Sequence, residues 1–235
     1  AGDVVLQVND AGITRPYVMD PTTFDADTAD AEIQYRNAVA WATARDAVTG
    51  TYIGTAVTVE SQMTQRETAG GGTFTLRRIF TAWDTGTTIP DDATIASATL
   101  SVTGSATNGA WTDGVVYLGN FANPPTALTT ADYDAFVDQT TYGTIDPWKL
   151  TDVADNSQTV LSSVDTLISK TGYTKLVIVN QKDRSDTAPT GTEQNYGTMD
   201  SADHATVAKR PHLVVAYNTA TPTPKFEKEK AAILE

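Results

Sequence analysis

Two histidines are the only imidazole groups in this 235-residue sequence. His204 lies in a polar segment, whereas His212 lies in an apolar run beside Leu213. Because neighbouring residues of a strand point to opposite faces, we expect the His212 ring to face solvent. A catalytic triad needs a nucleophile, a histidine and an acid that converge, and no G-x-S-x-G motif occurs in the chain. The sequence therefore assigns no catalytic residue.

Carboxylates are the most abundant reactive groups, and they gather in segments rich in turn-forming residues. Asp91-Asp92 and the pair Asp183/Asp186 are examples. Paired carboxylates could serve a glycosidase, although hydrogen bonding to the local backbone also explains acids in turns. Oxygen ligands suit Ca²⁺, so Asp183 and Asp186 are our candidate ligands for a structural calcium ion. The alternative is an acidic, solvated surface that keeps the protein soluble.

Composition excludes several classes of function. Acidic residues outnumber basic ones by 29 to 16, which gives a net charge of −13 and disfavours nucleic acid as a partner. The absence of cysteine removes disulfides, thiolate nucleophiles and cysteine-based zinc sites. No apolar run approaches the roughly 18–20 residues of a membrane span. The sequence starts at Ala1 without a signal-like segment, which we interpret as processing or omission of a leader.

Aromatic residues in loops are the candidates for binding a sugar, because the C–H face of a pyranose stacks on a flat ring. Trp111 is flanked by glycines and is our first candidate, followed by Tyr142 and Tyr196. Trp41 and Trp83 fall in predicted strands, and we expect both in the core.

These side chains must be positioned by strands, and the clearest pattern covers residues 74–104. Phe74, Leu76, Phe80 and Ala82 share one parity, which Arg78 interrupts. A second alternating run follows at residues 98–103, after a connection rich in Gly, Pro and Asp. The pattern predicts a β-hairpin with one buried and one wet face.

Other segments complete an all-β chain with short helices. Alternation predicts strands near residues 33–43 and 51–61, and apolar runs predict strands at 115–118, 175–180 and 211–217. Residues 129–136 predict a helical turn capped by threonine. Apolar residues spaced three and four apart predict a longer helix over residues 157–170.

The segment from Phe80 to Val102 also carries a family resemblance. Its elements Trp83-Asp84-Thr85, Ile89-Pro90-Asp91-Asp92-Ala93-Thr94-Ile95 and Ser97-Ala98-Thr99-Leu100-Ser101-Val102 resemble the DNRLRE-type, carbohydrate-binding-module-like β-sandwich family. Lys209 to Tyr217 resembles the family's last strand. The resemblance spans about residues 33–217 and implies a jelly-roll-like antiparallel β-sandwich without a fixed catalytic set. Such modules occur on exported polysaccharide-active enzymes, on cell surfaces and in phage structural proteins.

We therefore expect a β-sandwich domain at 33–217, an N-terminal strand and extended arm at 1–32, and a linker with a charged tail at 218–235. The first hypothesis is a non-catalytic structural or adhesive subunit at an extracellular or virion surface, such as a decoration, fibre or tail protein. Its two terminal segments would contact copies of itself or other subunits. The alternatives are a glycan-binding module and, last, a β-sandwich hydrolase or lyase.

Overall fold

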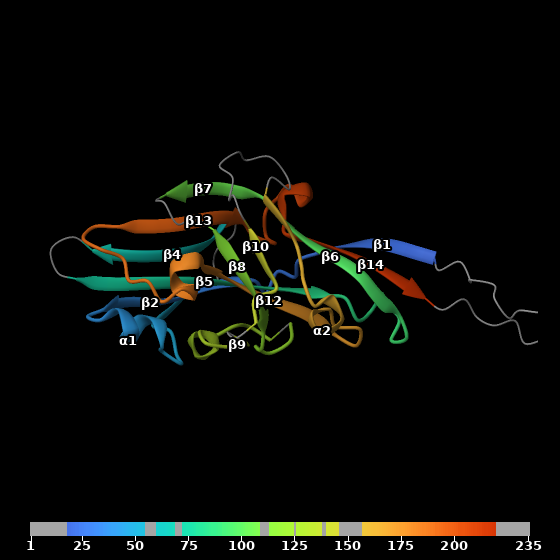
Figure 1. The fold of residues 1–235 in the computed structure, drawn as a ribbon, viewed down its shortest axis with the longest axis horizontal. Helices are drawn as coiled ribbons and strands as arrows, with labels where there is room; N and C mark the ends of the chain where they lie inside the picture. The colour runs from blue at the N-terminus through green and yellow to red at the C-terminus, as the bar shows by residue number, and fades with distance from the viewer. Residues whose placement is uncertain are drawn as a thin grey trace, which may run out of the picture.

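A computed structural model describes residues 18–54, 60–68, 72–108, 113–124, 126–137, 140–145 and 157–219. The chain folds into antiparallel β-sheets with only short helices between strands (Figure 1). This arrangement confirms the predicted all-β sandwich, whereas the jelly-roll connectivity stays a prediction. Among the described residues, no helix has the length and apolar character to cross a membrane.

The smaller sheet has four strands in the order β1-β14-β6-β11. Their bounds are β1 Val18–Asp25, β14 His212–Thr219, β6 Thr94–Val102 and β11 Ser157–Val160. The larger sheet follows the order β10-β8-β12-β5-β4-β13-β7, while β2 pairs with β3 and β5, and β9 pairs with β8. Its strands are β2 Ala31–Ala38, β3 Tyr52–Gly54, β4 Glu60–Thr68, β5 Thr73–Asp84, β7 Gly104–Asn108, β8 Gly114–Gly119, β9 Phe136–Val137, β10 Gly143–Ile145, β12 Tyr173–Asn180 and β13 Gln194–Asp200. The helices are α1 Trp41–Arg45, α2 Val164–Leu167 and α3 Gln181–Arg184, with 3₁₀ turns η1 Thr130–Asp132 and η2 Val207–Lys209.

Strand β5 is central to the larger sheet, and both of its faces are buried. Ile79 and Trp83 point into the cluster between the two sheets, which we call the sandwich core. Leu76, Phe80 and Ala82 point the other way, into a second cluster under α1 and the 121–136 segment, which we call the outer cluster. The prediction that one face of this strand is exposed to solvent is therefore wrong, because connecting segments cover that face.

The predicted hairpin is an arch between sheets. Strand β5 pairs in the larger sheet and β6 in the smaller one, so the two strands face each other across the sandwich core. The Thr85 hydroxyl donates to the Ser169 carbonyl at 2.6 Å, and the Gly86 N–H donates to Gly172 at 2.8 Å. A Cβ on Gly86 would lie 2.0 Å from the Gly172 nitrogen, so this crossing requires glycine.

The first and last described strands lie side by side. Strand β1 pairs with β14 along its whole length, from Val18 opposite Thr219 to Asp25 opposite His212. Residues 18–32, which we expected in an irregular arm, therefore belong largely to β1 and to the start of β2. The same pairing corrects the expectation for His212, which is 8% exposed because β1 covers it, with Asp25 Oδ1 2.8 Å from its Nδ1.

The long helix predicted over residues 157–170 is wrong. Its first residues form β11, which extends the smaller sheet by pairing with β6, and only Val164–Leu167 is helical. Ser163 stands between them at φ +50°, a left-handed conformation that interrupts a regular helix. Leu161 and Leu167 are nevertheless buried in the sandwich core. These apolar residues therefore pack inward as predicted, although the backbone that carries them is not a long helix.

Candidate functional site

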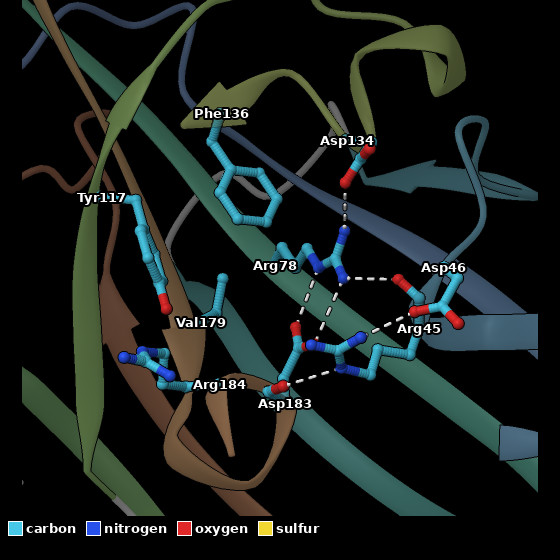
Figure 2. Close-up of a pocket in the computed structure, with 9 residues that line it drawn as sticks. All are labelled: Arg45, Asp46, Arg78, Tyr117, Asp134, Phe136, Val179, Asp183 and Arg184. Carbon is cyan, nitrogen blue, oxygen red and sulfur yellow. Dashed lines mark hydrogen bonds and ion pairs between the residues drawn. The ribbon is translucent and has the colours of Figure 1, made fainter. Parts of the chain in front are cut away.

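A pocket of about 330 Å³ opens on the outer face of the larger sheet (Figure 2). Strands β5, β8 and β12, helices α1 and α3 and the segment around β9 contribute its walls. The lining residues are Arg45, Asp46, Arg78, Tyr117, Asp134, Phe136, Val179, Asp183 and Arg184.

Arg78 lies at the centre of the pocket wall and is 2% exposed. It shares the face of β5 that carries Leu76 and Phe80, so the strand alternation directs a guanidinium into the outer cluster. Asp183, from α3, accepts two hydrogen bonds from it: Nε to Oδ2 at 2.9 Å and Nη2 to Oδ1 at 3.2 Å. This is a buried bidentate ion pair, the strongest geometry available to the two groups.

Three oxygen atoms from neighbouring segments accept the other hydrogen bonds of Arg78. Its Nη2 donates to the Arg45 carbonyl at 2.9 Å, and its Nη1 donates to the Tyr133 carbonyl at 3.1 Å and to Asp134 Oδ1 at 3.4 Å. With the two bonds to Asp183, these contacts match the five N–H donors of a guanidinium. Burial disfavours the charge, but Asp183 outweighs it and raises the pKa of Arg78 above its usual value. Arg78 therefore fastens β5 to α1, to α3 and to the 133–134 segment.

Aromatic rings enclose this ion pair. The Arg78 guanidinium carbon lies 4.3 Å from the Tyr133 ring centroid and 4.9 Å from that of Phe136. The Tyr133 hydroxyl donates to the Ala44 carbonyl at 2.8 Å, and burial raises the pKa of this phenol. Because the last carbonyls of a helix lack partners within the helix, Arg78 and Tyr133 complete the end of α1.

The rim of the pocket is polar and more exposed than its floor. Arg45 contacts Asp46 at 2.7 Å and donates from Nε to the Asp183 carbonyl at 3.1 Å. Arg184 is exposed, and its Nε makes a 3.4 Å contact with the Thr141 hydroxyl. Figure 2 shows the Tyr117 hydroxyl on the side of the pocket where Arg184 lies. The rim thus presents guanidinium donors and carboxylate acceptors close together.

The candidate calcium ligands both lie near this site, but each faces an arginine. Asp183 is paired with Arg78, as described above. Asp186 is exposed, lies 3.4 Å from Arg45 Nε, and accepts a 2.9 Å hydrogen bond from the Trp41 indole. Within the described ranges, no group of three or more His, Cys, Asp or Glu side chains is arranged to hold a metal ion. Calcium binding by these two residues stays a prediction, and a dication would compete there with guanidinium groups.

The two candidate sugar-binding aromatics that the structure describes, Tyr142 and Tyr196, lie on different segments. Tyr142 is 6% exposed and packs in the sandwich core, and its role in ligand binding stays a prediction. Tyr196 is half-buried in β13 rather than in a loop. Trp111 lies outside the described residues. Trp83 is fully buried as predicted, whereas Trp41 begins α1 and is only partly buried against the outer cluster.

Sequence reasoning did not assign a role to Arg78, although one signal was present. Arg78 is the only charged residue in the row of alternating positions from Phe74 to Ala82. A charge at a buried strand position requires a paired and hydrogen-bonded environment. A scan against protein-family models and a search of curated proteins both gave no match to this chain.

Proposed function

We propose that this protein is a non-catalytic structural or adhesive module of an extracellular assembly, such as a decoration, fibre or tail component of a virion surface. The resemblance of residues 80–102 to the DNRLRE-type family supports the proposal at the level of sequence. Copies of the same chain or other subunits of the assembly would be its partners.

The pairing of β1 with β14 is the observation that carries the proposal. Because Val18 lies opposite Thr219, the chain enters and leaves the sandwich at one end. Helix α1 lies at the other end of the molecule (Figure 1). A module attached in this way has one end available for joining an assembly and presents the other end outward.

Sedimentation of the full chain and of variants lacking residues 1–17 or 220–235 tests this proposal. The full chain is expected to associate at micromolar concentrations, and each deletion is expected to reduce association without changing the thermal unfolding midpoint of the sandwich. A full chain that stays monomeric over the whole concentration range, both alone and with its co-purifying subunits, would contradict the proposal.

A glycan-binding module is the second candidate, and the polar rim of the pocket supports it. Sugar hydroxyl groups both donate and accept hydrogen bonds, and Arg184, Asp46 and Asp134 offer both functions beside the Phe136 ring. A glycan array with the full chain tests it. Arg184→Ala is expected to weaken any hit at least tenfold, whereas Arg66→Ala, an exposed arginine on β4, is expected to leave it unchanged. Absence of any hit would remove this candidate.

A further inference from the structure

A lysine, a glutamate and an asparagine come together where α3 approaches the start of β13. Lys182 belongs to α3, Asn195 belongs to β13, and Glu193 immediately precedes that strand. Lys182 is only 5% exposed and Asn195 is fully buried. Lysine is almost never buried unless its amine is paired, so the groups around this amine decide what it can do.

One oxygen atom of Glu193 bonds to both of the other side chains. Its Oε1 accepts a hydrogen bond from Lys182 Nζ and a second one from Asn195 Nδ2 at 2.8 Å. Two donors that share one acceptor atom lie within about 6 Å of each other. The second oxygen, Oε2, accepts the Thr190 N–H at 3.1 Å and so fixes the carboxylate. An amine, a carboxylate and a carboxamide are therefore held side by side.

The backbone on both sides of this cluster is fixed independently of it. The Asn180 side chain caps α3 by accepting the Lys182 N–H at 2.9 Å, and the Lys182 carbonyl accepts the Thr187 N–H at 2.9 Å. Asn195 lies opposite Gln65 in the ladder between β13 and β4. The two side chains are thus positioned by the fold, which favours a reaction between them over one with outside groups.

The cluster contains the three groups that amide transfer needs, namely a nucleophile, an electrophilic carbonyl carbon and a base. Lys182 Nζ would attack the Asn195 Cγ, so that the Nζ–Cγ bond forms and the Cγ–Nδ2 bond breaks. Two protons would pass from Nζ to Nδ2 through Glu193, which ends as a carboxylate. The nitrogen of Nδ2 would leave as ammonium. Charge is conserved, and the step requires neither an oxidant nor a reductant.

We propose that Lys182 and Asn195 form an isopeptide bond in the folded chain, with Glu193 transferring the protons. The bond joins α3 covalently to β13 and closes the loop between residues 182 and 195. Because the sequence contains no cysteine, a disulfide cannot provide such a link. This modification site involves neither the partners nor the glycan of the proposed function and goes beyond both.

The ionisation of the cluster determines how fast the bond forms. The hydrogen bond from Lys182 lowers the pKa of Glu193 to about 2, so this carboxylate is available as a base at neutral pH. The amine must lose a proton to it before the attack, and this transfer is unfavourable. We therefore expect a slow reaction, which suffices because each chain reacts once.

Intact-mass spectrometry of the full chain tests the proposal directly. We expect a mass lower than that of the sequence by one ammonia molecule. After complete digestion with trypsin, the peptide 176–184 is expected to be joined to the peptide 185–209 and to remain uncut at Lys182. A chain with the mass of its sequence, both when fresh and after prolonged incubation at neutral pH, would overturn the proposal. This measurement needs no variant, so it is decisive even where a variant fails to fold.

Variants assign the three roles. Lys182→Arg keeps the positive charge but removes the nucleophile, and Asn195→Ala removes the carbonyl carbon, so both are expected to have the masses of their sequences. Glu193→Gln keeps the size of the side chain, and we expect it to slow the reaction at least tenfold. Lys175→Arg is the control, because Lys175 Nζ donates to a backbone carbonyl, and it should lose ammonia as the wild type does.

Two results with the variants would also overturn the proposal. Loss of ammonia that persists in Lys182→Arg would show that Asn195 cyclises on its own backbone, without the lysine. A rate that is unchanged in Glu193→Gln would show that the carboxylate only pairs with the amine and transfers no proton.

Discussion

The two buried clusters on either side of the larger sheet are built by different rules. The sandwich core joins apolar side chains of two sheets, including Trp83 and Leu100. The outer cluster also contains apolar side chains, but the ion pair between Arg78 and Asp183 lies at its edge and four chain segments meet there. Apolar packing between sheets needs only the strand alternation, whereas the outer cluster depends on a directional set of hydrogen bonds.

This difference matters because the two kinds of interaction fail differently. Removing buried carbon atoms costs the transfer free energy of those atoms and leaves a cavity. Removing one partner of a buried ion pair leaves the other charge uncompensated, although removing both partners can be nearly neutral. We therefore expect that replacing both partners of the ion pair costs less stability than replacing one, whereas losses from the apolar core accumulate.

Arg78→Ala is expected to have the largest effect. It leaves Asp183 buried without its counter-charge, and we expect a loss of about 3–5 kcal/mol in the free energy of unfolding, measured by urea denaturation. Arg66→Ala, the exposed control, should change it by less than about 0.5 kcal/mol. The double variant Arg78→Met/Asp183→Leu should recover much of the loss. If the double variant loses as much free energy of unfolding as the two single variants together, the ion pair is not what distinguishes the outer cluster from an apolar core.

The second prediction concerns how stability changes with pH, which depends on Asp30, a buried carboxylate between the two clusters. Asp30 precedes Ala31 of the outer cluster and bonds to Ala202 of the sandwich core. Because burial disfavours the charged form, its pKa in the folded protein, about 7, lies above the ordinary aspartate value of 3.8. The native state therefore binds more protons than the unfolded state between these values, and its stability falls as the pH rises from about 4 to 7.

The size of this decrease is at most about 4 kcal/mol. Urea denaturation at pH 4.5, 6 and 8 measures it. Asp30→Asn should flatten the curve, and it should be more stable than the wild type at pH 8. A wild-type curve that rises between pH 4.5 and 7 would show that other carboxylates dominate, and it would remove Asp30 as the controlling group.

Tyr133→Phe sharpens the comparison by deleting one hydroxyl from the outer cluster. The Ala44 carbonyl at the end of α1 then loses a donor in a buried position, at a cost of roughly 1–2 kcal/mol. Hydrogen exchange should show faster exchange in α1 without a change in β6. Uniform acceleration throughout both sheets would contradict a local role for the hydroxyl.

Glu193→Gln is expected to have the smallest effect. Its hydrogen bond from Lys182, with further ones from Asn195 and Thr190, lowers the pKa of Glu193 to about 2. In a chain that lacks the Lys182–Asn195 cross-link, this stabilisation is fully present above the ordinary glutamate pKa of 4.5 and is lost as the pH falls toward 2. Because the pair is partly exposed, we expect less than about 1 kcal/mol at pH 7 by thermal unfolding. A larger loss would mean that the loop before β13 supports the sheet more strongly than its exposure suggests.

Most of the fold class was predictable, because alternation and apolar runs locate β5, β6, β12 and β14 directly. The turn at η1 was also predictable, since the Thr129 side chain caps it as the sequence suggested, and the structure adds a return bond from the Thr129 N–H to Asp132. Strand partners were not predictable. The turn residues after Asp84 fit a hairpin equally well, and only the strand pairing, with β5 in one sheet and β6 in the other, shows an arch between sheets.

The polar pocket was only partly predictable from the sequence. Arg78 stands out as a charge in an apolar row, but nothing local identifies Asp183, 105 residues further along the chain, as its partner. Asp183 and Asp186, predicted as calcium ligands, both lie near the polar pocket, where arginines from distant segments face them. Helical periodicity at 157–170 was misleading because β6 offered an unpaired edge, and pairing with it outweighs local propensity.

The register of β1 against β14 also determines how the domain responds to mechanical force. Paired Cα atoms in antiparallel strands are about 4.5–5.5 Å apart, so the backbone at Val18 and Thr219 is nearly in contact. Pulling these two points in opposite directions would unzip the ladder one hydrogen bond at a time, at low force. Tethering both to one support and pulling from the α1 end would instead stretch both strands in the same direction. The sandwich should therefore be weak as a link in a linear chain and strong as a protruding head.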